Sequence, residues 1–254
     1  MSLVIDTDIG TDVDDAFALA YAIKNNADIK AIIIVHGDTE IRAKIARKLE
    51  RIFGANIPVI IGKSGPKKAQ KYWLGFEKNA LTPEELKEPL EKLAFPKYDE
   101  NMKLVCLGPL TNIAYQLENN PSIKNVKEIY VMGYSRNAHN FKVDLKAAEK
   151  VLAQPWDVYI ITKKVSKKIY FTRNDLEQFR GSELGNFLYD SAIRWLNCSK
   201  KRTSVMYDVL TVSAALQEGY VKFKKQTNNR FISYDVDLKL KDKIIETIGS
   251  AKWK

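Results

Sequence analysis

The sequence predicts an α/β protein built on an open, mostly parallel β-sheet with helices on both faces. Short apolar runs alternate with helix-like segments along the chain, and several of these runs are apolar at nearly every position. Strands of that kind are buried on both faces, which is typical of parallel sheets covered by helices. At 254 residues, 45% of them hydrophobic, the chain can bury one core, and we expect a single domain over residues 1–254.

Strand and helix patterns alternate through the first 101 residues. The β-branched run IKAIIIV predicts a buried strand, and Ile41, Ile45 and Leu49 give the next helix an apolar face. After residue 62, Thr82-Pro83-Glu84-Glu85 has the spacing of a capping box and predicts a helix start. The expected strands are 3–5, 29–35 and 57–61, and the expected helices are 14–24 and 40–53.

The alternation continues to about residue 216. A helix is expected to open at Tyr207-Asp208, and from residue 223 to the end the pattern indicates short antiparallel strands and turns. The other expected strands are 103–106, 128–132 and 158–162, and the other expected helices are 110–117, 145–152 and 184–195.

Composition argues against several classes of function. The 41 basic and 31 acidic residues give a net charge of +10, but the lysines are scattered and no nucleic-acid-binding motif accompanies them. No apolar run reaches the roughly 18 residues of a membrane span, and the first residues lack the features of a signal peptide. Two cysteines, Cys106 and Cys198, are too few for a disulfide framework. We therefore expect a cytoplasmic protein with neither nucleic acid nor membrane as partner.

Five carboxylates fall within ten residues directly after the first expected strand: Asp6, Asp8, Asp12, Asp14 and Asp15. Such charges repel one another, and a bound hard cation removes that repulsion. Ligands that are all oxygen select Ca²⁺ or Mg²⁺. Acids that stabilise a helix N-terminus would account for Asp14 and Asp15, but not for Asp6 and Asp8. The pattern therefore predicts a metal site.

The other expected strands deliver polar groups to the same sheet edge, because ligands of open α/β sheets bind beyond the carboxyl ends of the strands. The edge is thus predicted to be rich in carboxylates and amides. The groups concerned are Asp38 after the second strand, Leu107-Gly108-Pro109 after the fourth, Asn137, His139 and Asn140 after the fifth, and Tyr207-Asp208 at a later helix start.

The segment DTDIGTDVDDA at residues 6–16 resembles the N-terminal aspartate motif of the inosine–uridine-preferring nucleoside hydrolase family, in its longer variant with two extra residues. Matching blocks follow in order and span roughly residues 3–216. The resemblance implies a Rossmann-like nucleoside hydrolase fold. The blocks are VHGDT at 35–39 followed by RAKIA at 42–46, LGPLTNIA at 107–114, VMG at 131–133, NFKVDLKAA at 140–148, and Asp208.

The resemblance also implies a catalytic Ca²⁺, with Mg²⁺ less favoured. Its ligands would be the carboxylates of Asp8, Asp15 and Asp208 and the main-chain carbonyl of Leu107. Asp8 would in addition take a proton from a water molecule on the metal.

For the substrate, the resemblance implies that Asp14 and Asn140 hold the ribose hydroxyls. Asp38 stands where the family often has asparagine, and Asn137 is expected as a further substrate contact. The two-residue insertion leaves Asp12 as an alternative to Asp14, which we favour because the Asp-Asp-Ala junction aligns without a gap.

Three positions depart from the family pattern. Tyr207 stands where many members carry a histidine that protonates the leaving base, Ala138 replaces a glutamate, and Leu74 replaces another histidine. A tyrosine, with an ordinary pKa of about 10, is a weaker acid than histidine. Packing against the helix start is an equally good account of Tyr207. We expect structural roles for His36 and Cys106, and for His139 a structural role or an approach to the site.

The leading hypothesis is a calcium-dependent hydrolase of the N-glycosidic bond of ribonucleosides that releases free base and ribose and acts as a homodimer or homotetramer. A first alternative is a degenerate member that binds metal or ribosides with little turnover. A second is a phosphohydrolase of the haloacid-dehalogenase type, with Asp6 as nucleophile and Asp8 as acid/base, although the later acidic pair of those enzymes is missing. The base preference stays open.

Overall fold

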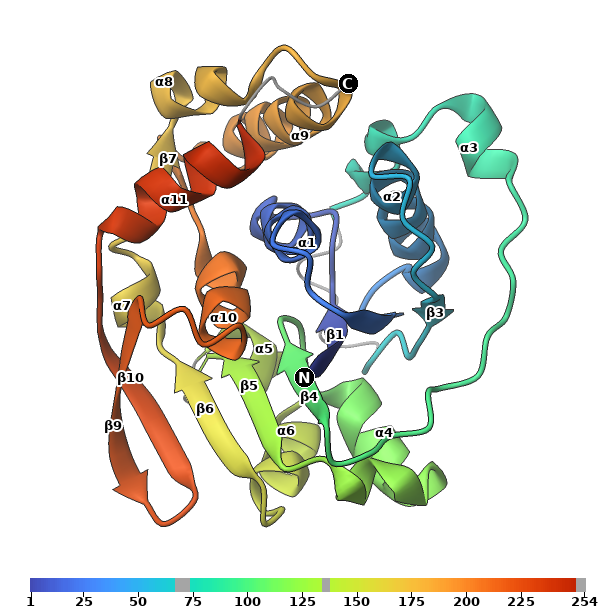
Figure 1. The fold of residues 1–254 in the computed structure, drawn as a ribbon. Coiled ribbons are helices and arrows are strands. Elements are labelled where there is room, and N and C mark those ends of the chain that lie inside the picture. Colours follow the sequence, from blue (N-terminus) through green and yellow to red (C-terminus); the bar gives the residue numbers. More distant parts are fainter. Residues whose placement is uncertain (67–73, 134–137, 250–254) are drawn as a thin grey trace.

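An eight-stranded sheet forms the centre of the computed structural model, which describes residues 1–66, 74–133 and 138–249 (Figure 1). Neighbouring strands are parallel except at one edge, where β9 runs antiparallel to β10. The predicted open, mostly parallel sheet is confirmed. In spatial order the strands are β3 (Val59–Ile61), β2 (Ile29–Ile34), β1 (Ser2–Thr7), β4 (Met102–Cys106), β5 (Glu128–Met132), β6 (Asp157–Ile161), β10 (Arg230–Val236) and β9 (Val221–Thr227).

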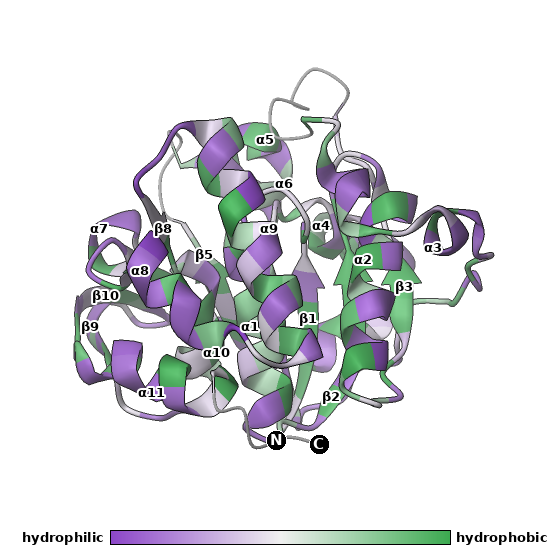
Figure 2. Ribbon diagram, turned by 90° about the horizontal axis from the view of Figure 1, so that it is seen from above, coloured by the Kyte–Doolittle hydropathy of each residue, from purple (hydrophilic) through white to green (hydrophobic). Residues whose placement is uncertain are grey.

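Helices cover both faces of this sheet, and successive strand residues point to opposite sides. In β1, Leu3 and Ile5 belong to one apolar cluster and Val4 to the other. Figure 2 shows hydrophobic and hydrophilic residues alternating along α2 and α9, as expected for helices buried on one side. The first cluster includes α1 (Asp14–Lys24), α2 (Thr39–Ile52), α9 (Glu183–Ser199), α10 (Tyr207–Ala215) and α11 (Lys239–Ile248), and the second includes α4 (Thr111–Asn119), η3 (Pro121–Asn125), α5 (His139–Val143) and α6 (Leu145–Leu152).

Most element boundaries agree with the sequence pattern. The helix expected at 14–24, the strand at 128–132 and the helix at 145–152 match α1, β5 and α6 residue for residue. The capping box is present at α3 (Pro83–Lys87). The Thr82 side chain accepts a hydrogen bond from the Glu85 N–H, and the Glu85 side chain accepts one from the Thr82 N–H.

The prediction for the C-terminal region was wrong in part. The antiparallel pair β9–β10 is present, but a ten-residue helix, α11, follows it where only strands and turns were expected. Leu240, Ile244 and Ile248 recur every four residues and are buried, and the helix packs against α1. The same spacing predicted the helix at 40–53, so the sequence did carry the signal for α11.

A small second sheet was also missed, made of β7 (Tyr170–Thr172) and β8 (Thr203–Val205) in antiparallel pairing. Three-residue strands are too short to show a period of two. Short helical turns surround these strands and complete the described elements. They are α7 (Lys163–Ser166), α8 (Arg173–Leu176), η4 (Glu177–Phe179) and, elsewhere in the chain, η2 (Glu77–Ala80).

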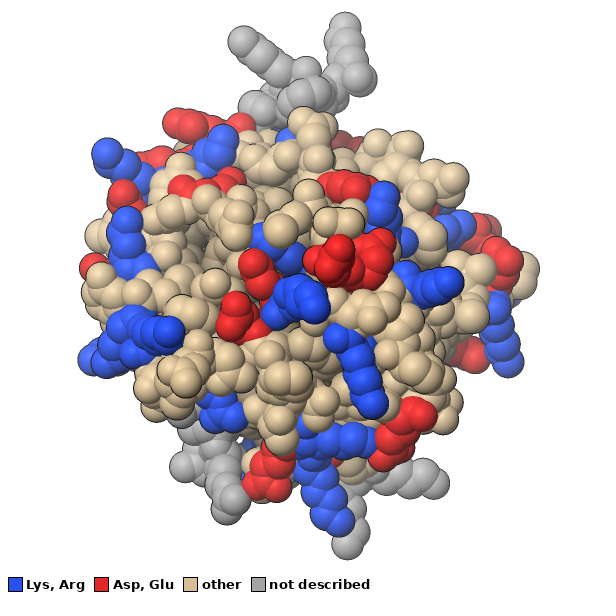
Figure 3. All heavy atoms as spheres, turned by 60° about the horizontal axis from the view of Figure 1, so that its bottom comes forward, with Lys and Arg blue, Asp and Glu red and all other residues tan. Residues whose placement is uncertain are grey.

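On the face of the molecule seen in Figure 3, lysine and arginine side chains are spread widely, and acidic side chains lie between them. Cys106 is buried in the core of β4, as expected. Within the three described ranges, no helix combines the length and the apolar character needed to cross a membrane. The single domain over residues 1–254 stays a prediction.

Candidate functional site

A cavity of about 160 Å³ lies at the carboxyl ends of β1, β4 and β5. Five carboxylates line it: Asp8, Asp12, Asp14 and Asp15 from the segment after β1, and Asp208 from the start of α10. The sheet edge predicted from the sequence is therefore where the acidic side chains meet. The other lining residues are Thr11, Leu107, Met132, Gly133, Ala138, His139, Asn140, Lys163, Trp195, Lys201 and Tyr207.

The loop between β1 and α1 has a fixed conformation. The Thr7 hydroxyl donates to the Asp15 carboxylate at 2.5 Å and accepts from the Ile9 N–H at 3.2 Å, which ties the strand end to the helix start. Gly10 has a φ of +121°, and a Cβ at this position would lie 2.8 Å from Cδ1 of Ile45. Because L side chains rarely adopt this φ, the loop conformation favours glycine at this position.

Arg42 of α2 supports the same loop from below. Its buried guanidinium donates to the main-chain carbonyls of Asp8 and Ile9, the latter at 2.7 Å, and to the Thr11 hydroxyl at 3.0 Å. Thr11 in turn donates to the Glu77 carboxylate at 2.7 Å. One rigid, planar group thus binds three points of the aspartate loop. The sequence pattern alone indicates no role for this arginine.

Three carboxylates are close enough to share a cation. One oxygen from each of Asp14, Asp15 and Asp208 lies within 4.8 Å of the others, and each residue is only 4% exposed. Asp8 and the predicted carbonyl ligand Leu107 line the same cavity but are not members of this trio. Two predicted ligands therefore lie together, and their neighbour in the trio is Asp14, to which the resemblance assigns a ribose contact.

Burial makes it difficult to ionise these acids together. Burial, together with the charge of Asp8, raises the pKa of Asp15 from 3.8 to about 8. Burial also raises the pKa values of Asp14 and Asp208 well above 3.8. Burial also raises the pKa of Asp12 to about 7, although the charge of Lys201 opposes the rise. A divalent cation would compensate the repulsion, and the oxygen-only donors fit a hard cation.

The segments after β4 and β5 meet beside Asp8. The Asn140 amide donates to the Leu107 carbonyl at 2.5 Å and to the Met132 carbonyl at 3.3 Å, which brings this predicted ribose contact to the predicted carbonyl ligand. A Cβ on Gly108 would lie 2.8 Å from the Asp8 carboxylate, so glycine is needed for the close approach.

Two predicted substrate residues are not brought to the cavity. Asp38 is exposed and caps α2, where its carboxylate accepts from the Ile41 N–H at 3.1 Å. A strand end that is followed at once by a helix uses its acid as an N-cap, which explains this position. Asn137 lies outside the described residues.

The positions that depart from the family pattern lie in different surroundings. Tyr207 opens α10 beside Asp208 and lines the cavity, as does Ala138. Leu74 is 49% exposed and does not line it. Asp6 is fully buried and accepts from the Asn112 amide at 2.7 Å, away from the cavity, so it is badly placed to act as a nucleophile.

The two histidines pack against each other at the strand ends, with ring centroids 6.1 Å apart. His36 is fully buried, which agrees with a structural role, and His139 reaches the cavity. Burial lowers the pKa of His139 to about 4, so it is neutral at pH 7.

Trp195, Lys201 and Lys163 also line the cavity and were not predicted. Trp195 is 4% exposed on α9, and the Lys201 ammonium lies 4.6 Å from the centre of its ring. Trp195 and Lys201 come from a part of the chain without a recognisable motif. Only the apolar period of α9 marks Trp195, and that period does not distinguish a cavity from a core.

Comparisons with known proteins agree on one family. The model of a family described as inosine-uridine preferring nucleoside hydrolase matches residues 3–250. Probable uridine nucleosidase 1 of Oryza sativa subsp. japonica is 25% identical over 88% of this chain and 79% of its own length. The non-specific ribonucleoside hydrolase RihC of Klebsiella pneumoniae is 28% identical over 59% of this chain and 57% of its own.

Among solved structures, the purine-preferring ribonucleoside hydrolase from Gardnerella vaginalis superposes with a TM-score of 0.81 and 20% identity. The superposition covers 97% of both chains. At that identity the likeness concerns the fold, and it includes the parallel sheet whose carboxyl edge carries the five carboxylates.

Proposed function

Because the chain belongs to the inosine–uridine preferring nucleoside hydrolase family, we propose that it hydrolyses the N-glycosidic bond of ribonucleosides and releases free base and ribose. The relatives named uridine nucleosidase and ribonucleoside hydrolase support this reaction. The observation that carries the proposal is the buried trio of Asp14, Asp15 and Asp208 in a cavity that Asp8 also lines. A small polar ligand rich in hydroxyl groups fits such a lining.

Calcium is the cation we propose for this site, held by Asp8, Asp15, Asp208 and the carbonyl of Leu107. Its support is a donor set made only of oxygen and the mutual repulsion of buried carboxylates. When bound, such a cation supplies acidification of a water molecule and binding of vicinal hydroxyl groups. The trio leaves Asp14 as an alternative ligand to Asp8.

The chain's own residues have separate roles in the proposed reaction. Asp8 accepts a proton from water while the new C–O bond forms at C1′ of the ribose. The C1′–N bond breaks, its electron pair passes to the base, and the Tyr207 hydroxyl donates a proton to the base. Asp14 and Asn140 bind ribose hydroxyls, with Asp12 as the alternative to Asp14. The surrounding carboxylates stabilise the positive charge that develops on the sugar.

We also propose a homodimer or homotetramer in the cytoplasm. The family resemblance supports the oligomer, and two unpaired cysteines, Cys106 in the core and Cys198 at the surface, agree with a reducing compartment. Light scattering coupled to size exclusion would measure the oligomeric state directly.

The experiment that tests the function is release of reducing sugar from purine and pyrimidine nucleosides, with calcium and after chelation. We expect calcium-dependent release by the wild type and a loss of about 10³-fold or more in Asp8→Asn, which keeps the shape of the side chain but cannot accept the proton. If the wild type binds calcium and nucleoside but releases no sugar, the chain is a degenerate binder. Ala138, Leu74 and Tyr207 would then be the first positions to restore.

A further inference from the structure

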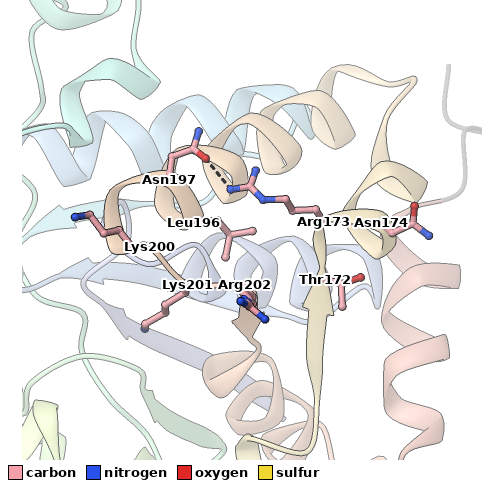
Figure 4. Close-up of a pocket in the computed structure, with 8 residues that line it drawn as sticks. All are labelled: Thr172, Arg173, Asn174, Leu196, Asn197, Lys200, Lys201 and Arg202. Atoms are coloured by element: carbon pink, nitrogen blue, oxygen red, sulfur yellow. Dashed lines mark hydrogen bonds between the residues drawn. The ribbon is translucent and has the colours of Figure 1, made fainter.

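A second hollow, of about 490 Å³, lies between the start of α8 and the end of α9 (Figure 4). Four cations line it: Arg173, Lys200, Lys201 and Arg202. The remaining lining residues are neutral, and among the described residues no carboxylate lines the hollow. Positive potential gathered in a concave surface favours an anionic ligand.

Two of these cations flank the small second sheet. Thr172, the last residue of β7, pairs with Thr203, the first residue of β8, and Arg173 and Arg202 are the residues directly outside this pair. Arg173 is held in place, since its guanidinium donates to the Asn197 side chain at 2.7 Å, and Figure 4 shows it reaching from β7 toward α9.

Stabilisation of helix ends does not account for the whole cluster. Lys200 and Lys201 follow the last turn of α9, where cations are favourable. Arg173, however, is the first residue of α8, and a cation at a helix N-terminus is unfavourable. Arg202 lies in the exposed bend between α9 and β8. The position of the two arginines is therefore not that of helix-end stabilisation.

The hollow adjoins the carboxylate-lined cavity through a shared side chain. Lys201 lines both, and its ammonium lies over the ring of Trp195, which is itself buried in the wall of the cavity. The two spaces are therefore neighbours at Lys201.

We propose that this hollow binds the phosphate of a 5′-phosphorylated riboside whose ribose occupies the carboxylate-lined cavity. The ribose part of this inference rests on the proposed function. The 5′ hydroxyl is the one hydroxyl of a ribonucleoside outside the 2′,3′-diol. A phosphate at this position therefore leaves the diol available to the carboxylates. The planar guanidinium group of arginine can donate two parallel hydrogen bonds to two oxygens of one phosphate.

The test compares inosine with inosine 5′-monophosphate in binding by calorimetry and in release of reducing sugar. Three proteins are used: the wild type, the double variant Arg173→Gln/Arg202→Gln, and the control Lys224→Gln/Lys225→Gln, which removes the same charge from exposed positions of β9. We expect the double variant to bind the monophosphate about tenfold or more weakly, with inosine unaffected. The control should behave as the wild type with both compounds.

The other possible results distinguish a failure of the phosphate site from a failure of the proposed hydrolysis. If inosine is hydrolysed but the monophosphate binds no more tightly than inosine, or equally well to the double variant, the phosphate site is wrong. If neither compound is hydrolysed yet the double variant still loses affinity for the monophosphate, the site stands and the proposed hydrolysis fails. If a single-stranded oligonucleotide binds through the two arginines and the monophosphate does not, the hollow serves a polynucleotide and the proposal is overturned.

Discussion

Arg42 determines how the aspartate loop is presented, although it lies outside the cavity lining. Its guanidinium binds the carbonyls of Asp8 and Ile9 and the hydroxyl of Thr11, and a fully buried group of this kind keeps its position. These hydrogen bonds hold the backbone of a loop whose carboxylates, among them Asp8 and Asp12, line the cavity. Arg42 is a positioning residue in this sense.

Replacing Arg42 with lysine should weaken calcium binding by about 10–100-fold, because lysine keeps the charge but cannot bind three points of the loop at once. Calorimetric titration with calcium measures this loss, and the rate of nucleoside hydrolysis at saturating calcium should recover in large part. Arg47→Lys on the exposed side of the same helix is the matched control. Unchanged calcium affinity in a folded Arg42→Lys protein would contradict the role.

Tyr207→Phe separates the two interpretations of this tyrosine, proton donor or packing residue. The ring is kept and only the hydroxyl is lost, so we expect kcat for purine nucleosides to fall by about 10–100-fold with little change in KM. A 4-nitrophenyl riboside has a leaving group that needs no proton, and its hydrolysis should be unaffected. Equal losses with both substrates would argue that Tyr207 acts through packing.

The sequence contained enough information for half of the site. The aspartate motif is contiguous, so Asp8, Asp12, Asp14 and Asp15 had to follow β1 together, and Asp208 opened a recognisable helix. Trp195 and Lys201 reach the cavity only because α9 packs across it, and no local pattern encodes that contact. Asp38 was misleading, because an acid between a strand and a helix serves equally well as an N-cap.

At the scale of elements, strands buried on both faces were the easiest to predict and weakly patterned elements the hardest. The strand β5 was predicted residue for residue because its apolar run is continuous, whereas β7 and β8 are too short to carry a period. The helix α11 was missed although its buried residues, Leu240, Ile244 and Ile248, have the same four-residue spacing that predicted α2. Its apolar side packs against α1, as the spacing implies.

Ile244→Ala tests whether α11 belongs to the core. Ile244 is fully buried, so truncation should lower the free energy of unfolding by about 2–5 kcal/mol. Urea denaturation at constant calcium measures this loss. Glu246→Ala, two residues further on the exposed side, should change it by less than about 0.5 kcal/mol. A loss at Ile244 no larger than at Glu246 would show that α11 is not part of the cooperative unit.

At the scale of the whole molecule, the carboxylate site links the stability of the fold to pH and to the cation. Burial raises the pKa of Asp15 from 3.8 to about 8 in the metal-free fold. Between pH 4 and 8 the folded state therefore binds a proton that the unfolded chain has lost. Since the folded state holds more protons, its stability decreases as pH rises through this range. A cation reverses the sign, because it favours the ionised carboxylates.

The melting temperature of the chelated protein should accordingly fall between pH 5.5 and 8, by roughly 3 °C for each pH unit and titrating carboxylate. Saturating calcium should raise the melting temperature at every pH, and most at pH 8, where fewer protons must be displaced. Differential scanning calorimetry across this range, with calcium and with chelator, measures both slopes. Asp15→Asn removes one of these carboxylates and should make the metal-free slope less steep, while Asp14 and Asp208, whose pKa values burial also raises, still contribute. A chelated wild type that becomes more stable as pH rises from 5.5 to 8 would contradict the linkage, because the buried acids would then already be ionised in the folded protein without a cation.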